Sequence, residues 1–317
     1  MIRQTLPTEL KDYYSDLDNV QWDMSKVEVL EQKNFLLFRR TLYRIPDAWP
    51  DGDKVEPIYV YHFSVGKKRP TVNCTDILGG TMKWDEIKKR ANTNYPIGVI
   101  NSLACVLFKR WNAFIVCADN KGMFDKGDTV ERFKSSLLNI VYNNIQAVQF
   151  IKTLFTTDIE KVYSIGVSLG ALTMAGIYGI EDSYKKSVII LGGWPLDKII
   201  ANSSEGMVKN FYNRMVSLYG NEVTQQLKDG LQVTNDIYAF GPGNGVLQIM
   251  MNNKDTSIPS EFQKKYADLV KPKEVLTLKY RRFLAISQLK NAHYQTLLYY
   301  PYLIYRSIRF LNLQESK

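Results

Sequence analysis

The sequence predicts an α/β fold with one doubly wound, mostly parallel sheet of eight strands and helices on both faces. Three observations predict it. Short apolar runs alternate with helical segments along most of the 317 residues, which is the pattern of βαβ units. The later runs are apolar at nearly every position, as in parallel strands covered on both faces. Apolar residues make up 45% and charged residues 23% of the chain, as in folded domains.

Eight runs are predicted to be strands because they are rich in β-branched and aromatic residues and are bounded by turn residues. They lie at 34–45, 57–65, 69–74, 112–119, 161–167, 186–193, 246–253 and 274–280. The first two are expected to form an antiparallel pair, joined through the Pro- and Asp-rich segment 45–54.

Helical spacing of apolar residues predicts helices at 97–110, 130–155, 168–180 and 293–312. Residues 162–180 carry no charge over 19 positions, which is nominally long enough to cross a membrane. The segment nevertheless contains four glycines and two serines and changes its period in the middle. A buried strand followed by a buried helix is therefore the better interpretation.

The connection between the sixth and seventh strands is too long for a simple crossover. Its roughly 50 residues have helical spacing and predict a helical cap over residues 195–244. The predicted layout is an N-terminal extension at 1–33, a core at 34–194 and 245–317, and this cap. Apolar cap residues either line an acyl pocket or form the packed face of a lid, and the second is more usual; they are Phe211, Tyr212, Met215 and Tyr219.

The net charge of +9 is concentrated in residues 271–317, which hold nine Lys/Arg and two Asp/Glu. No nucleic-acid-binding motif accompanies this charge, so no nucleic-acid partner is predicted. A final helix that mixes aromatics with arginines suggests contact with a membrane surface as an alternative to packing on the sheet, which is favoured. The sequence does not indicate an oligomeric state.

The three cysteines, Cys74, Cys105 and Cys117, have no metal-ligand spacing, and their odd number gives no disulfide framework. The N-terminus has no apolar leader. Both features favour a cytoplasmic location, and neither a metal nor an organic cofactor is predicted. The glycine-rich run 240–245 precedes a strand, so it is interpreted as a turn and not as a phosphate-binding loop.

Ser168 lies between Gly166 and Gly170 at the junction of a predicted strand and a predicted helix. Glycines on both sides allow a strained turn to fold back closely on neighbouring elements. The turn also places the serine at a helix N-terminus, where free N–H groups stabilise developing negative charge. Ser168 is therefore a candidate nucleophile.

A serine hydroxyl needs a base to remove its proton, and the chain has two histidines, His62 and His293. His62 lies inside an early strand and is interpreted as structural. His293 lies in a loop after the last strand, at the sheet end that carries Ser168. His293 is therefore the candidate base.

The third member should be a carboxylate that orients the imidazole and balances its charge. Asp255 follows a predicted strand in a turn closed by Pro259, and Asp197 after the preceding strand is its competitor. Asp255 is favoured because a turn after a strand directs its side chain toward the carboxyl edge of the sheet. The order is then Ser168, Asp255, His293.

These residues resemble the α/β-hydrolase family over roughly residues 35–312. The resemblance rests on Gly-Val-Ser-Leu-Gly after a strand, Asn-Asn-Lys-Asp-Thr-Ser-Ile-Pro after a later strand, and Asn-Ala-His-Tyr-Gln-Thr before the last helix. Nucleophile, acid and base occur in the order of that family. Residues 116–124 also resemble its segment after the fourth strand, where Asp is followed shortly by Gly.

The chain departs from the family after the third strand, where the usual His-Gly turn is missing from 69–86. The resemblance implies an oxyanion hole with one donor from the backbone N–H of Leu169 and a second from 74–76, with Thr75 favoured. It further implies a serine hydrolase that cleaves a small-molecule acyl ester through an acyl-enzyme. Thioester or peptide cleavage, and a catalytically silent binding protein, are the alternatives.

Overall fold

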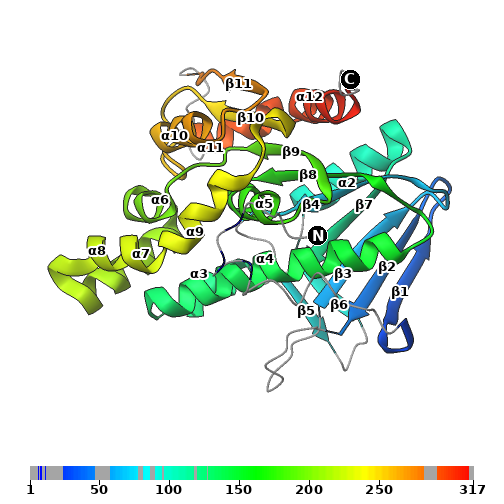
Figure 1. Ribbon diagram of the computed structural model, residues 1–317, viewed down its shortest axis with the longest axis horizontal. Coiled ribbons are helices and arrows are strands. Elements are labelled where there is room, and N and C mark those ends of the chain that lie inside the picture. The colour runs from blue at the N-terminus through cyan, green and yellow to red at the C-terminus, as the bar shows by residue number, and fades with distance from the viewer. Residues whose placement is uncertain are drawn as a thin grey trace.

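The computed structural model describes residues 24–46, 58–77, 81–85, 90–94, 96–117, 120–126, 128–281 and 291–313, together with residues 6, 8 and 11. The predicted connection 45–54 and residues 118–119 of the segment compared with the family lie mostly or wholly outside these ranges. The description below concerns the described residues, which contain the complete central sheet (Figure 1).

One sheet of nine strands forms the centre, in the spatial order β1-β2-β3-β7-β4-β8-β9-β10-β11. Its strands are β1 (Glu28–Asn34), β2 (Arg39–Ile45), β3 (Ile58–Ser64), β4 (Arg69–Thr75), β7 (Asn112–Cys117), β8 (Thr157–Val167), β9 (Tyr184–Ile190), β10 (Val246–Met251) and β11 (Glu274–Leu278). The six neighbouring strands β7, β4, β8, β9, β10 and β11 pair in parallel. The pairs β1–β2, β2–β3 and β3–β7 are antiparallel. The predicted α/β class, the mostly parallel sheet and the antiparallel β2–β3 pair are confirmed.

The strand count is a correction, because nine strands form the sheet and not eight. The additional strand, β1, lies in the segment assigned to the N-terminal extension. Its sequence, Glu-Val-Leu-Glu-Gln-Lys-Asn, is mostly polar because the strand forms an exposed edge of the sheet. A turn in which Phe35 N donates to Phe38 O separates β1 from β2. The strand predicted at 34–45 therefore begins only at Arg39. A separate ladder, β5 (Thr81–Asp85) with β6 (Arg90–Asn94), was not predicted.

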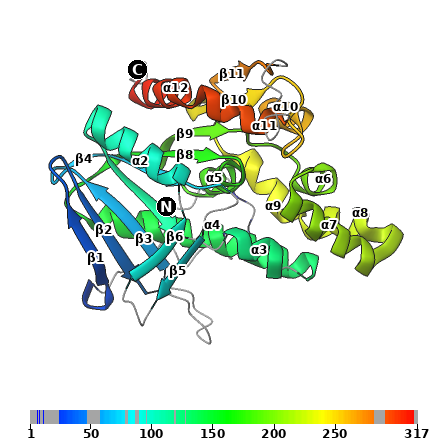
Figure 2. The same cartoon turned by 180° about the vertical axis from the view of Figure 1, so that it is seen from behind.

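Helices cover both faces of the sheet (Figures 1 and 2). The helices of the described residues are α2 (Pro96–Lys109), α3 (Asn120–Lys126), α4 (Val130–Thr153), α5 (Leu169–Ile180), α6 (Leu196–Asn202), α7 (Gly206–Tyr219), α8 (Val223–Gly230), α9 (Gln232–Ile237), α10 (Ser260–Val270), α11 (Ala292–Gln295) and α12 (Tyr300–Asn312), of which α3, α7 and α8 extend beyond the end of the sheet. Short 3₁₀ turns include η2 (Met24–Lys26), η3 (Gly220–Glu222), η4 (Tyr238–Phe240), η5 (Gly243–Gly245) and η8 (Thr296–Tyr299).

Two apolar cores lie on opposite faces of the sheet. One combines strand residues with α4, α5 and α10, and the other combines strand residues with α2 and α12. The final helix therefore packs on the sheet, as favoured from the sequence. The uncharged segment 162–180 is the end of β8 followed by α5, as interpreted. No helix among the described residues has the length and apolar character needed to span a bilayer.

The segment predicted as a cap is helical and contains α6 to α9. A third apolar cluster joins it to α3, α4 and the start of α5. Phe211 and Met215 are fully buried in that cluster, with the Phe211 ring stacked on Phe133 at 4.7 Å between centroids. These two side chains therefore form the packed face of the helices.

Candidate active site

Ser168 occupies the turn between β8 and α5 in a strained backbone conformation. Its φ is 57° and its ψ is −121°, a region that non-glycine residues rarely adopt. Its N–H donates to Ile190 O at 2.9 Å, and its carbonyl accepts from Ala171 N and Leu172 N. The turn is thereby tied to β9 on one side and to the first turn of α5 on the other.

The two flanking glycines are required by close backbone contacts. A Cβ on Gly166 would lie 2.4 Å from the carbonyl oxygen of Gly170. A Cβ on Gly170 would lie 2.4 Å from the carbonyl oxygen of Asp76, which follows β4. Such distances are well inside van der Waals contact, so the tight turn after β8 excludes larger residues here. The explanation of these glycines from the sequence agrees with this packing.

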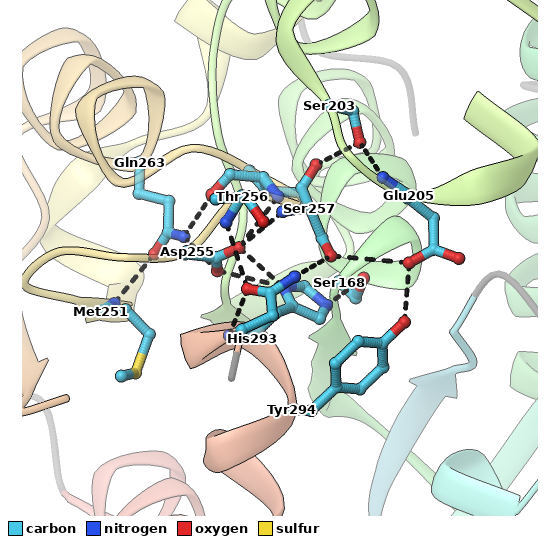
Figure 3. Close-up of polar contacts among 12 residues, drawn as sticks. Ser168, Ser203, Glu205, Met251, Asp255, Thr256, Ser257, Gln263, His293 and Tyr294 are labelled. Atoms are coloured by element: carbon cyan, nitrogen blue, oxygen red, sulfur yellow. Dashed lines mark hydrogen bonds and ion pairs between the residues drawn. The ribbon is translucent and has the colours of Figure 1, made fainter. Parts of the chain in front are cut away.

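His293 lies at the start of α11 and contacts both Ser168 and Asp255 (Figure 3). Its Nε2 is 2.9 Å from Ser168 Oγ. Its Nδ1 is 3.0 Å from Asp255 Oδ2 and 3.2 Å from Oδ1. With the proton on Nδ1 donated to Asp255, Nε2 is free to accept from the serine hydroxyl. The three residues selected from the sequence are thus joined by hydrogen bonds.

Asp255 is buried and fully satisfied by hydrogen bonds. Its Oδ1 accepts from the backbone N–H groups of Ser257 and Ile258 at 3.0 and 3.1 Å. Its Oδ2 accepts from Gln263 Nε2 at 2.8 Å. Hydrogen bonds of this kind stabilise the ionised carboxylate against the cost of burial. The aspartate is held in one orientation, in which both of its oxygens can also accept a hydrogen bond from His293 Nδ1.

Two amide side chains that the sequence analysis missed hold this arrangement in place. Gln263 on α10 donates to Asp255 and to Ile258 O at 2.7 Å, and its Oε1 accepts from Met251 N. Asn291 accepts from the backbone N–H of His293 at 3.0 Å and donates to Ser257 Oγ at 2.9 Å. Gln263 lies 8 residues from Asp255 and Asn291 lies 34 residues from Ser257, and no local pattern predicts either contact, although Asn directly before a helix is a usual N-cap.

The two rejected alternatives lie in other environments. Asp197 is buried at the start of α6, where its Oδ1 accepts from Asn235 Nδ2 at 3.0 Å. His62 is buried inside β3, with its ring 6.3 Å from the Tyr43 ring. Burial lowers the pKa of His62 to about 4, so this imidazole is neutral near pH 7. Both positions agree with structural roles.

The segment after β4 packs directly against the nucleophile turn. The Thr75 hydroxyl donates to Gly170 O at 2.8 Å, while Asp76 accepts from Ile77 N at 2.7 Å and from Gly98 N at 3.1 Å. Burial raises the pKa of Asp76 to about 6. Of this segment, Ile77 lines the cavity beside Ser168 and Thr75 does not. Leu169, the first residue of α5, also lines it.

An apolar cavity of about 330 Å³ opens at Ser168 and His293. Apolar side chains from α5, α6 and α7 form much of its wall, namely Leu169, Leu172, Leu196, Ile199, Ile200, Met207 and Val208. Of the four cap residues singled out in the sequence, none lines it. Within the described ranges, no three His, Cys, Asp or Glu side chains gather to hold a metal ion.

The polar pair Glu205 and Tyr294 also lines this mostly apolar cavity. Tyr294 OH donates to Glu205 Oε2 at 2.8 Å, and Ser257 Oγ donates to the same oxygen at 3.5 Å (Figure 3). Partial burial and the neighbouring Glu205 carboxylate raise the pKa of Tyr294 to about 12. The tyrosine therefore stays protonated and remains a hydrogen-bond donor near neutral pH.

No protein-family model matches the sequence, and no curated protein sequence matches it. Solved structures do match. Acetyl xylan esterase 1 from Thermoanaerobacterium sp. aligns over 94% of this chain and 95% of its own, with a TM-score of 0.63 and 12% identity. An acetyl xylan esterase from Paenibacillus sp. R4 aligns over the same shares, with a TM-score of 0.61 and 11% identity.

A third structure is matched over only part of its length. The acylaminoacyl peptidase of Pyrococcus horikoshii aligns over 92% of this chain and 51% of its own, with a TM-score of 0.53 and 11% identity. At identities this low, the likeness shows a shared fold and carries no substrate from one protein to another.

Proposed function

We propose that this chain, which has the α/β-hydrolase fold, is a serine hydrolase that cleaves a carboxylic ester. The observation that carries the proposal is the unbroken set of hydrogen bonds from Ser168 through His293 to Asp255. It lies on a strained turn, at the wall of an apolar cavity. Nucleophile, base and orienting carboxylate then occupy the roles of a catalytic triad.

In the first step, Ser168 Oγ attacks the acyl carbonyl carbon while its proton passes to His293 Nε2. The imidazolium that forms is stabilised by the Asp255 carboxylate at 3.0 Å from Nδ1. His293 then gives this proton to the departing alcohol oxygen, leaving the acyl group on Ser168. A water molecule, deprotonated by His293, hydrolyses the acyl-enzyme and restores the serine hydroxyl.

The tetrahedral oxyanion is proposed to accept from two backbone N–H groups. The first is Leu169, whose N–H lies at the N-terminus of α5, where the helix dipole also favours negative charge. The second is proposed to come from residues 74–76, with Thr75, the last residue of β4, favoured. Both donors are main-chain groups, so the missing His-Gly turn does not exclude this chemistry.

The cavity supports an apolar acyl group as the substrate portion bound there. Its volume of about 330 Å³ suits a short or medium acyl chain, and its apolar walls would be covered on binding. We propose that residues 195–244 act as the cap that supplies part of this wall. A cytoplasmic location also remains a proposal, supported by three cysteines that form no disulfide.

The test is hydrolysis of p-nitrophenyl esters, from acetate to palmitate, by the wild type and Ser168→Ala. The wild type should turn over the shorter esters, and the variant should lose about 10⁴-fold or more in kcat because the nucleophile is gone. A fluorophosphonate should label the wild type and not the variant. Thioester and peptide substrates follow if no ester is cleaved.

Equal ester turnover by Ser168→Ala would remove Ser168 from the mechanism. If the wild type cleaves no ester, thioester or peptide and takes no fluorophosphonate label, the chain is a binding protein on a hydrolase scaffold.

A further inference from the structure

Four connections meet at the edge of the sheet where its parallel strands begin. They are the β1–β2 turn at 35–38, the β3–β4 turn at 65–68, the α2–β7 junction at 110–111 and the α4–β8 connection at 154–156. Strand pairing brings them together, since Arg39 lies opposite Ser64, Phe63 opposite Ala113 and Arg69 opposite Thr157. We call this region, residues 32–40, 64–72, 107–113 and 152–157, the basal edge.

The basal edge lies away from the candidate active site. Figure 1 shows its turns at the right-hand end of the sheet, whereas α6, α7 and α8 lie at the left-hand end. Ser168 follows the carboxyl end of β8, and Thr157 begins that strand at the basal edge. The two regions are therefore at opposite ends of the same strands.

Large apolar side chains project into solvent from the basal edge. Leu36 is 98% exposed, Phe155 81% and Phe108 72%, while Phe35 and Leu37 are 48% and 40% exposed. The β1–β2 turn and Phe155 line one shared hollow of about 550 Å³. Arg110 Nη1 donates to Leu37 O at 3.4 Å, which ties the end of α2 to the same turn. Five apolar side chains gathered on adjoining turns are more than the scattered exposure of an ordinary surface.

The charge of the basal edge is predominantly positive, with the carboxylates Glu31, Asp158 and Glu160 bordering it. Its four segments contain nine Lys and Arg residues and no Asp or Glu. Arg40 and Lys33 pair with the neighbouring Glu31. Within the described part of the chain, no carboxylate forms an ion pair with the exposed cations that remain at the turns, namely Arg39, Lys67, Lys68, Arg69, Lys109 and Arg110.

We propose that the basal edge docks on the surface of an anionic lipid bilayer. Leu36, Phe155 and their apolar neighbours would enter the boundary between headgroups and acyl chains, while the surrounding Lys and Arg side chains contact lipid phosphates. Apolar burial and attraction to anionic headgroups are the two contributions from which peripheral membrane binding is built.

Two other occupants fit this surface less well. A second copy of the chain, docked edge to edge, would bring unpaired cations against unpaired cations. A nucleic acid would satisfy the cations and could stack bases on Phe108 or Phe155, but Leu36, the most exposed apolar side chain, offers a base neither a hydrogen bond nor an aromatic face. A bilayer uses the cations and the aliphatic side chains together. In the docked orientation, the cavity at Ser168 faces away from the lipid.

The experiment is co-sedimentation of the full chain with vesicles of phosphatidylcholine alone, or of phosphatidylcholine and phosphatidylglycerol in equal parts. Binding is expected to the anionic vesicles only and should weaken as salt is raised. Leu36→Asp, Phe155→Ser and the double variant Lys67→Gln/Lys68→Gln should each lower the partition coefficient about tenfold. All three change exposed side chains, so ester turnover in solution should match that of the wild type.

Matched controls lie on α7 and α8, away from the basal edge. Leu218→Asp alters a leucine that is 54% exposed, and Lys209→Gln/Lys228→Gln removes the same charge as the double variant. Both should sediment like the wild type. The proposal is overturned by no binding to anionic vesicles, by equal loss in the controls, by a concentration-dependent dimer that Leu36→Asp abolishes, or by binding to nucleic acid without binding to vesicles.

Discussion

At the scale of single residues, Gln263 holds Asp255 and the turn around it in place through hydrogen bonds. Its amide donates to the carboxylate and to Ile258 O, and its carbonyl accepts from Met251 N at the end of β10. The side chain is fully buried. Gln263 thus connects the turn that holds Asp255 to both α10 and the sheet, and its side chain hydrogen-bonds to neither Ser168 nor His293.

Replacing Gln263 should therefore slow the reaction more than it weakens substrate binding. In Gln263→Met the carboxylate loses one of its hydrogen bonds, and kcat for a p-nitrophenyl ester should fall about tenfold or more with KM nearly unchanged. Gln232→Met is the control, because Gln232 is an exposed glutamine whose amide donates to Asp236. A wild-type kcat in Gln263→Met would show that Asp255 needs no such support.

His62 should make the protein less stable in acid. Burial lowers its folded-state pKa to about 4, below the value near 6.5 expected in the unfolded chain. The unfolded state therefore binds the extra proton first, and stability is lost as pH falls from about 6.5 toward 4, by up to about 3 kcal/mol. His62→Phe should lack this loss.

Urea unfolding at several pH values between 4 and 7 gives the free energy of unfolding of the wild type and of His62→Phe. The effect of His62 is the difference between the two proteins in how steeply this free energy changes with pH. Asp76, whose raised pKa acts in the opposite direction, is present in both proteins and cancels in the comparison. Parallel slopes would mean that His62 takes up its proton in the folded state as readily as in the unfolded chain.

At the scale of elements, the apolar strands were predictable, whereas the polar edge strand β1 and the helix α10, whose sequence mixes charged with apolar residues, were not. The strands β8, β9 and β10 are continuous apolar runs because both of their faces are covered. The edge strand β1 has no such run, because its pairing with β2 is set by main-chain bonds and its side chains face solvent. A search for apolar runs therefore misses β1, although it finds the other edge strand, β11, whose sequence Glu-Val-Leu-Thr-Leu is mostly apolar.

The helices α6 and α7 should set the acyl length that the cavity accepts. Met207 is only partly buried and lines the cavity at the start of α7. Met207→Trp should fill part of the volume, lowering kcat/KM for p-nitrophenyl octanoate about tenfold while leaving acetate nearly unchanged. The conservative Met207→Leu should retain the wild-type profile. An unchanged ratio of octanoate to acetate turnover in Met207→Trp would place the acyl group elsewhere.

At the scale of the whole molecule, the candidate site was predictable where chain order and strand ends sufficed. Ser168, Asp255 and His293 each follow a strand and converge at one edge of the sheet, which parallel topology requires. Gln263 bonds Asp255 across the turn before α10, Asn291 bonds Ser257 over 34 residues and Tyr294 bonds Glu205 over 89 residues. No local pattern in the sequence encodes these side-chain contacts, so they were not predicted.

The distance along the chain between Ser168 and His293, 125 residues, has a consequence for the time at which the site can form. During synthesis, the segment around Ser168 leaves the ribosome long before the segment around His293, and Asp255 precedes the histidine by 38 residues. A nascent chain that already contains β8 and α5 therefore still lacks the candidate base. The proposed triad can be completed only once the late segment around residue 293 docks, so a chain released before that point should not turn over an ester by this route.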